Sequence, residues 1–133
     1  MHTGSCLCGA VRYEIEGPLA GIELCHCGMC RRASGSAFAS NMNVAAANFR
    51  IVAGASSLKA YESSPGKERV FCAECGSPIL SRQTADPSTV RVRVGTLAEP
   101  VEARPVFHFL VDSKASWWPI TDALPQHRGP RPR

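Results

Sequence analysis

Seven cysteines in three short clusters constrain this 133-residue chain more than any other feature. Within each cluster the thiols lie two or three residues apart: Cys6 and Cys8; Cys25, Cys27 and Cys30; Cys72 and Cys75. Four thiolates complete a tetrahedral zinc site, whereas three leave one coordination position for water or a substrate. The seven ligands therefore divide into one closed and one open site, and an open site predicts an enzyme.

Disulfides are an alternative use of these thiols, but two observations argue against them. Seven is an odd number, and thiols two residues apart are poorly placed to pair. Residues 1–5 do not begin an apolar run, so no signal peptide is visible, and we expect a cytoplasmic chain with reduced thiols. A single structural zinc with three spare thiols is the competing interpretation.

The net charge of +4 does not by itself indicate a nucleic-acid partner, because the basic residues are unevenly distributed. Three of the 15 basic residues lie at 126–133, where there is no acidic residue. Residues 1–125 are nearly neutral and lack the clustered basic surface of nucleic-acid-binding domains. No apolar stretch is long enough to span a membrane. We expect one zinc-binding domain at 1–125 and a flexible, basic, proline-rich tail at 126–133.

Apolar residues recur mostly with a period of two, which predicts β-strands. Residues 11–15 and 90–94 alternate apolar and polar side chains, and 106–111 is apolar on both faces apart from His108, which suggests a central strand. Shorter strands are expected at 37–44, 49–52, 58–62, 68–72 and 79–82. Helix is expected only at 27–33 and 113–117. The pattern predicts an all-β or β-rich fold of small antiparallel sheets.

The cysteine motifs resemble those of the glutathione-dependent formaldehyde-activating enzyme family, which is grouped with centromere protein V. The resemblance lies in residues 4–11, 25–32 and 71–77, and the Val94-Gly95-Thr96-Leu97 segment, His108 and Trp117 also fit the family pattern. The likeness covers roughly residues 4 to 125 and includes all seven cysteines.

The resemblance implies a zinc-stapled β-tent with one structural and one catalytic zinc. The implied ligands are Cys6, Cys8, Cys72 and Cys75 for the structural ion, and Cys25, Cys27 and Cys30 for the catalytic ion. The resemblance also implies a carbon–sulfur lyase that combines glutathione and formaldehyde into S-hydroxymethylglutathione, or runs the reverse reaction. The ligand division agrees with the spacing, because the first and third clusters join distant segments, as a staple must in a small fold.

A zinc ion with three thiolates carries one net negative charge, which makes it a poorer activator of water than a three-histidine site. A thiol suits the open position better, because sulfur is a soft ligand that metal coordination deprotonates. We therefore expect glutathione or a similar small thiol to bind at Cys25, Cys27 and Cys30 and to add to a small aldehyde such as formaldehyde.

Neighbouring residues have both functional and ordinary interpretations. His26 is the nearest candidate for giving a proton to the product oxygen, but it could equally pack beside the metal. Arg31 and Arg32 could bind a carboxylate of glutathione, or be solvated residues near the end of a short helix. His108 lies in an apolar run and is expected to be a hydrogen-bonded strand residue.

A non-catalytic zinc-binding interaction module of the same fold is the alternative to an enzyme. In that case His26 would be the fourth protein ligand at the site of Cys25, Cys27 and Cys30, or that site would hold no metal. The lack of a clustered basic face argues against chromatin binding in this chain.

Overall fold

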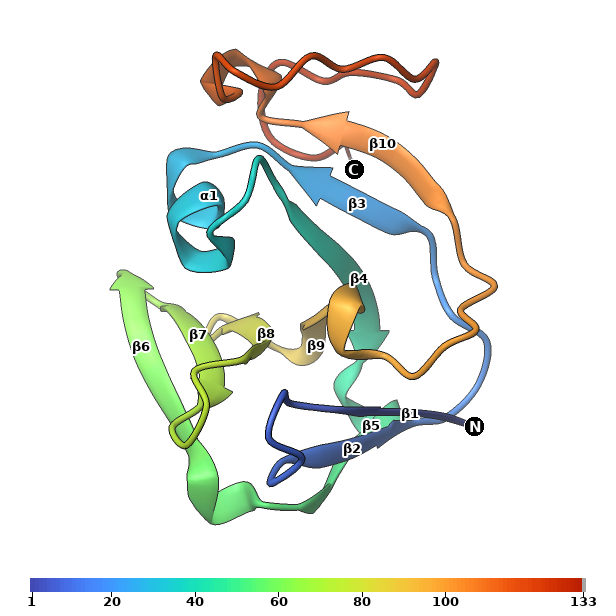
Figure 1. Ribbon diagram of the computed structural model, residues 1–133, viewed down its shortest axis with the longest axis vertical. Coiled ribbons are helices and arrows are strands. Elements are labelled where there is room, and N and C mark those ends of the chain that lie inside the picture. The colour runs from blue at the N-terminus through green and yellow to red at the C-terminus, as the bar shows by residue number, and fades with distance from the viewer. Residues whose placement is uncertain (133) are drawn as a thin grey trace.

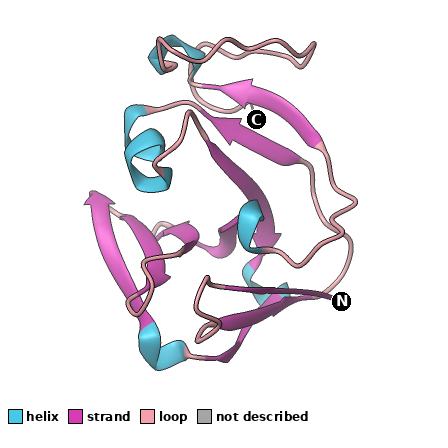
Figure 2. Cartoon of the chain, viewed as in Figure 1, coloured by secondary structure: helices cyan, strands magenta, loops and turns pink. Residues whose placement is uncertain are grey.

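The computed structural model describes residues 1–132, whose strands form two sheets (Figures 1 and 2). The smaller, antiparallel sheet has the order β1 (His2–Ser5), β2 (Arg12–Ile15), β5 (Phe49–Ala53). The larger sheet has the order β10 (Pro105–Phe109), β3 (Ile22–Cys25), β4 (Ala39–Ala45), β9 (Asp86–Arg93), β8 (Pro78–Gln83), β7 (Lys67–Cys72), β6 (Leu58–Ser64). All its pairs are antiparallel except β10 with β3. The β-rich prediction is confirmed, and the larger sheet is mixed.

Alternation along the strands gives the larger sheet an apolar and a polar face. In β9, Val90 and Val92 are buried in the main core, while Arg91 and Arg93 take the alternate positions. The small sheet contributes Tyr13 to the same core. The apolar face is therefore covered by the small sheet, and the polar face is left to line a cleft.

In residues 1–132 helical structure is limited to one short α-helix, α1 (Gly28–Ser34), and single 3₁₀ turns. Cys27 caps the N-terminus of α1, and Gly35 ends it in the left-handed conformation, with its N–H donating to the Arg31 carbonyl at 2.8 Å. The helix expected at 27–33 is thus present, but residues 113–117 do not form one. A 3₁₀ turn occupies Val111–Ser113 instead. With seven residues, α1 is far shorter than the roughly 20 needed to cross a membrane, and no other helix in residues 1–132 is longer.

Strand β10 lies at the edge of the larger sheet, so the expectation of a central strand is wrong. Its open edge is covered by the C-terminal segment. The His108 N–H donates to the Pro125 carbonyl at 2.9 Å, the His127 N–H donates to the His108 carbonyl at 2.9 Å, and the Leu110 N–H donates to the Gly129 carbonyl at 2.8 Å. This pairing satisfies backbone groups at the edge of β10, which would otherwise be open to another strand.

The same contacts bear on the tail expected to be flexible at 126–133. Its residues 126–129 follow β10, and Arg131 pairs with Glu23 of β3 at 2.7 Å. Arg133 lies outside the described residues. Up to Arg131 this segment lies against the larger sheet, and the flexibility of the tail stays a prediction.

Candidate metal centres

The first and third cysteine clusters meet between the two sheets. Cys6 and Cys8 lie in the turn between β1 and β2, Cys72 ends β7, and Cys75 lies in the turn that follows. The Sγ atoms of Cys6 and Cys8 are 3.6 Å apart, those of Cys8 and Cys72 are 3.9 Å apart, and all four lie within 4.8 Å of one another. Four thiolates around a zinc ion lie about 3.8 Å apart, so these residues fit a closed tetrahedral site.

Glycines after the cysteine pairs let the backbone turn around this cluster. Gly9 and Gly76 both have a φ near 80°, a conformation that other residues rarely adopt. The Gly76 N–H donates to the Cys72 carbonyl at 2.7 Å, and the Val11 N–H donates to the Cys6 Sγ at 3.3 Å. The Val11 amide therefore supports the Cys6 sulfur, and the Gly76 amide closes the turn that carries Cys75.

The three cysteines of the middle cluster come from one short segment, the end of β3 and the start of α1. Cys25 ends β3, Cys27 caps α1, and Cys30 lies in the first turn of α1. Their sulfurs lie within 4.8 Å of one another, and among residues 1–132 no histidine or carboxylate joins them. Cys25 and Cys30 are buried, while Cys27 is partly exposed. Three converging sulfurs beside a cavity are the donor set expected for a zinc ion with one open position.

Hydrogen bonds within the clusters favour thiolates. The Cys27 sulfur accepts hydrogen bonds from the Cys25 and Cys30 thiols, which lowers the pKa of Cys27, and the same interaction raises the pKa of Cys25. In the other cluster, a hydrogen bond from the Cys8 backbone N–H lowers the pKa of Cys75 to about 6. In each cluster one sulfur is therefore biased toward the thiolate, which is the form that binds metal.

Two arginines that the sequence reasoning missed lie beside the middle cluster. The guanidinium of Arg69 is 3.8 and 3.9 Å from the Cys30 Sγ, and its Nε donates to the Ser63 hydroxyl at 3.0 Å. The buried Arg93 donates to the Asn41 side-chain oxygen. The alternation of apolar and polar residues predicted a strand at 90–94, but no neighbouring residue indicated that the polar side of this strand would face the cysteines.

His26 is fully buried and is directed at His108 instead of the sulfurs. Its Nε2 is 2.7 Å from His108 Nδ1, and His108 Nε2 is 3.0 Å from the Asp122 carboxylate. Burial lowers the pKa of His26 to about 4, so its ring is neutral at pH 7. When His108 is also neutral, its Nε2–H donates to Asp122 and its Nδ1 accepts from His26 Nε2–H. His26 Nδ1 is then an unprotonated, buried atom that has no hydrogen-bond partner within residues 1–132.

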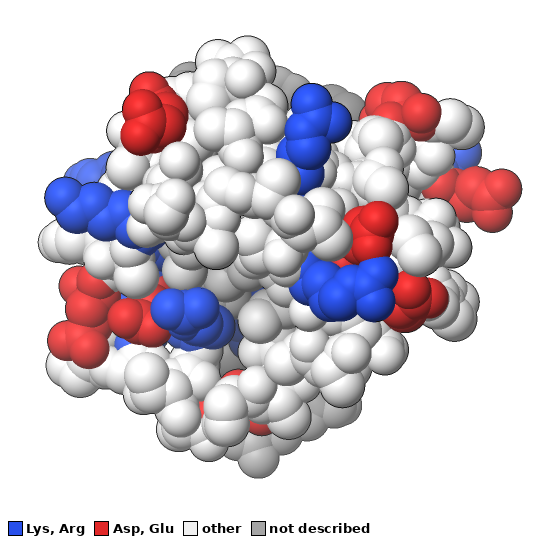
Figure 3. All heavy atoms as spheres, turned by 90° about the horizontal axis from the view of Figure 1, so that it is seen from below, with Lys and Arg blue, Asp and Glu red and all other residues white. Residues whose placement is uncertain are grey.

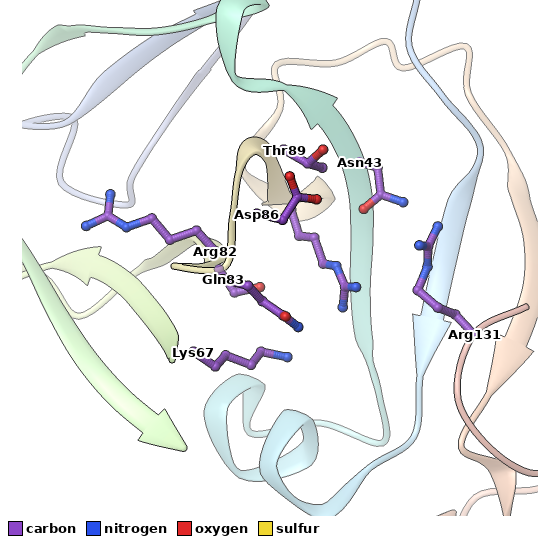
Figure 4. Close-up of a pocket in the computed structure, with 9 residues that line it drawn as sticks. Asn43, Lys67, Arg82, Gln83, Asp86, Thr89 and Arg131 are labelled. Atoms are coloured by element: carbon purple, nitrogen blue, oxygen red, sulfur yellow. The ribbon is translucent and has the colours of Figure 1, made fainter. Parts of the chain in front are cut away.

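Two adjoining cavities, of about 200 and about 240 Å³, lie over the polar face of the larger sheet. The first is lined by Cys25, Cys27 and Cys30, and both share Lys67, Gln83, Arg91 and Arg131. Figure 4 shows the Lys67 and Arg131 side chains on opposite sides of the second cavity. A ligand held by the three cysteines would thus lie among positive side chains.

Comparisons with known proteins agree with this geometry. The family model described as glutathione-dependent formaldehyde-activating enzyme matches residues 1–113. The chain belongs to this family. It is 30% identical over 123 residues to a Halomonas elongata protein named "Putative glutathione-dependent formaldehyde-activating enzyme", covering 86% of this chain and 77% of that one. It is also similar to a Rhodobacter sphaeroides protein of known crystal structure, with a TM-score of 0.63 and 28% identity over 78% of this chain and 99% of the other.

Arg31 and Arg32, expected to bind a carboxylate, line neither cavity beside the cysteines. Arg32 folds back on α1 and donates to the Gly28 carbonyl at 3.3 Å, and Arg31 has a buried Nε with no partner in the described chain. Their role in binding glutathione stays a prediction. Lys67 and Arg91, which the sequence analysis did not select, line the cavity that contains the three sulfurs.

Proposed function

We propose that this protein is a zinc-dependent carbon–sulfur lyase that joins a small thiol, glutathione or a similar one, to a small aldehyde such as formaldehyde, or runs the reverse reaction. The supporting observation is the convergence of Cys25, Cys27 and Cys30 beside a cavity, with no fourth protein ligand in residues 1–132. The free thiols of the two clusters would require reducing surroundings, so the proposal places the protein in the cytoplasm.

Cys25, Cys27 and Cys30 would hold the catalytic zinc, and Cys6, Cys8, Cys72 and Cys75 the structural one. A zinc ion at the three-cysteine cluster would supply an open, sulfur-preferring position that keeps a thiol deprotonated. The substrate sulfur then forms the C–S bond with the carbonyl carbon, while the π electrons of the carbonyl move to its oxygen, which takes up a proton. No protein side chain needs to act as the nucleophile.

The positive side chains near the cluster favour this chemistry. Arg69 lies against Cys30, and Lys67 and Arg91 line the same cavity, so a thiolate is stabilised there relative to a thiol. His26 is less suited to giving a proton than the sequence suggested, because its ring is neutral and its Nε2 faces His108. We infer that His26 mainly orients the Cys25–Cys27 loop and that water supplies the proton.

The test combines metal counting with X-ray absorption at the zinc edge, with and without glutathione. We expect two zinc ions per chain and one added sulfur neighbour at one of them when glutathione is present. Formation of S-hydroxymethylglutathione, followed by proton NMR, should be faster than the uncatalysed reaction. Cys27→Ser should abolish the added rate and remove one zinc, whereas a second variant, Leu7→Ala, changes an exposed side chain near the closed cluster and serves as a control.

A non-catalytic module would give a different result. A zinc ion already saturated by four protein ligands, with no change on adding glutathione, would contradict the lyase and favour the module. The described geometry does not favour closure by His26, because that ring is engaged with His108 and its nitrogens do not join the sulfur cluster.

A further inference from the structure

The polar face of the larger sheet gathers positive charge beside the three-cysteine cluster. The strand register places one row of residues across β7, β8, β9 and β4: Arg69, Ser81, Arg91 and Asn43. Lys67 lies two positions before Arg69 in β7, and Arg93 lies two positions after Arg91 in β9, so both share this face. Four cationic side chains therefore come from two strands that are far from Cys25 in sequence.

Within residues 1–132 none of these four cations has an acidic partner, although two neighbouring arginines do. Arg82 pairs with Glu68 at 2.9 Å, and Arg131 pairs with Glu23 at 2.7 Å. Within residues 1–132, neither Lys67 nor Arg91 forms an ion pair or a side-chain hydrogen bond. Lys67 is also half-buried, and burial together with the neighbouring Arg69 lowers its pKa. Buried positive charge without an anion is costly, so this arrangement is suited to receiving one.

The cavities around Lys67 and Arg91 show where that anion would lie. No aspartate or glutamate of the described chain lines the cavity that contains the cysteines. Asp86 lines only the adjoining cavity, where its carboxylate accepts hydrogen bonds from Ser88 (Figure 4). Phe109 and Leu110 form an apolar part of the inner wall, which strengthens an ionic contact by limiting access of water.

We propose that Lys67 and Arg91 bind a carboxylate of the thiol substrate, so that the site selects thiol acids over neutral or cationic thiols. This inference rests on the proposed function and names the class of thiol that the three-cysteine cluster takes. The Arg91 guanidinium is able to hold both carboxylate oxygens, and the Lys67 ammonium acts as a second positive charge. Lys67 and Arg91 are thus specificity-determining residues.

Three small thiols of similar size test the inference: 3-mercaptopropionate, 2-mercaptoethanol and cysteamine, which are anionic, neutral and cationic. Their binding to the zinc-loaded protein is measured by isothermal titration calorimetry. We expect 3-mercaptopropionate to bind at least about tenfold more tightly than 2-mercaptoethanol, and cysteamine to bind most weakly.

Variants assign the preference to the two side chains. Lys67→Met and Arg91→Met should each weaken 3-mercaptopropionate binding roughly tenfold while leaving 2-mercaptoethanol binding unchanged. Lys59→Met removes a positive charge from an exposed position that lines neither cavity, and it should alter neither affinity. Zinc content and circular dichroism verify that each variant is folded, and an unfolded Met variant is replaced by Lys67→Gln or Arg91→Gln.

Equal affinities for the three thiols, or equal losses for the neutral and anionic thiols in the variants, would overturn the inference. Failure of the proposed function gives a different pattern. If 3-mercaptopropionate binds selectively through Lys67 and Arg91 but no thiol adds to formaldehyde, the carboxylate site stands and the lyase does not. If the addition proceeds equally with neutral and anionic thiols, the lyase stands and the carboxylate site does not.

Discussion

At the scale of single residues, Tyr13 shows how the core is joined to the polar side of the fold. Its ring is buried between the two sheets, and its hydroxyl donates to Thr96 Oγ1 at 2.7 Å, which in turn donates to the Arg93 carbonyl at 2.8 Å. The period-two pattern was sufficient to predict that Tyr13 faces the core. Its hydroxyl partner lies 83 residues away and depends on the packing of the sheets.

Tyr13 should make the protein sensitive to alkali. Burial raises the pKa of Tyr13 from near 10 to about 12, so the neutral form is favoured in the folded state. The unfolded chain releases this proton at lower pH, so stability is complete below pH 10 and falls as pH rises toward 12, by up to about 2 kcal/mol. Urea unfolding between pH 8 and 11.5 should show a steeper loss for the wild type than for Tyr13→Phe. Parallel pH profiles of unfolding free energy for the two proteins would contradict a raised pKa of Tyr13.

At the scale of elements, most strands could be predicted from the sequence, but β1 and β3 could not. β3 has only four residues, and the charge of Glu23 gave no sign that both faces of the strand are buried; β1 is equally short and contains Gly4. The position of β10 was also misjudged. An apolar run indicates burial on both faces, but it does not distinguish a central strand from an edge strand covered by a distant segment.

Removing residues 125–133 tests the role of the C-terminal segment. The truncation exposes the backbone of His108 and Leu110 at the edge of β10, so we expect a lower melting temperature and self-association, measured by calorimetry and size-exclusion chromatography. A shorter truncation after Gly129 keeps the backbone contacts and removes the Arg131–Glu23 pair. It should lower stability by less, about 1 kcal/mol, because the pair is partly exposed. Equal stability of all three chains would show that the segment does not hold β10.

At the scale of the whole molecule, the two cysteine clusters have different structural consequences. The four-cysteine cluster connects the β1–β2 turn of the small sheet to the end of β7 in the larger sheet, whereas the three-cysteine cluster lies within the local β3–α1 segment. Acidic and basic side chains are interspersed on the face in Figure 3, so that face has no patch of one sign. The absence of a nucleic-acid partner stays a prediction.

Cys72→Ser and Cys27→Ser should therefore differ in stability. Cys72→Ser breaks the connection between the sheets and should lower the melting temperature by more than about 10 °C, because a structural zinc contributes several kcal/mol to folding. Cys27→Ser should remove one zinc but preserve a cooperative transition within a few degrees of the wild type. Differential scanning calorimetry with parallel zinc analysis measures both. A larger decrease in melting temperature for Cys27→Ser than for Cys72→Ser would contradict the assignment of the four-cysteine cluster as the structural site.

The sequence by itself determined the local features: the grouping of the thiols, the period-two strands, and the α1 boundaries at Cys27 and Gly35. These depend on neighbouring residues, so short-range spacing is enough to predict them. Only the tertiary structure decided that Lys67 and Arg91 face the Cys25 cluster and that the C-terminal segment covers β10. Those arrangements follow from strand order and register between distant segments, which are selected by burial of the whole core and are not encoded in any one stretch of the chain.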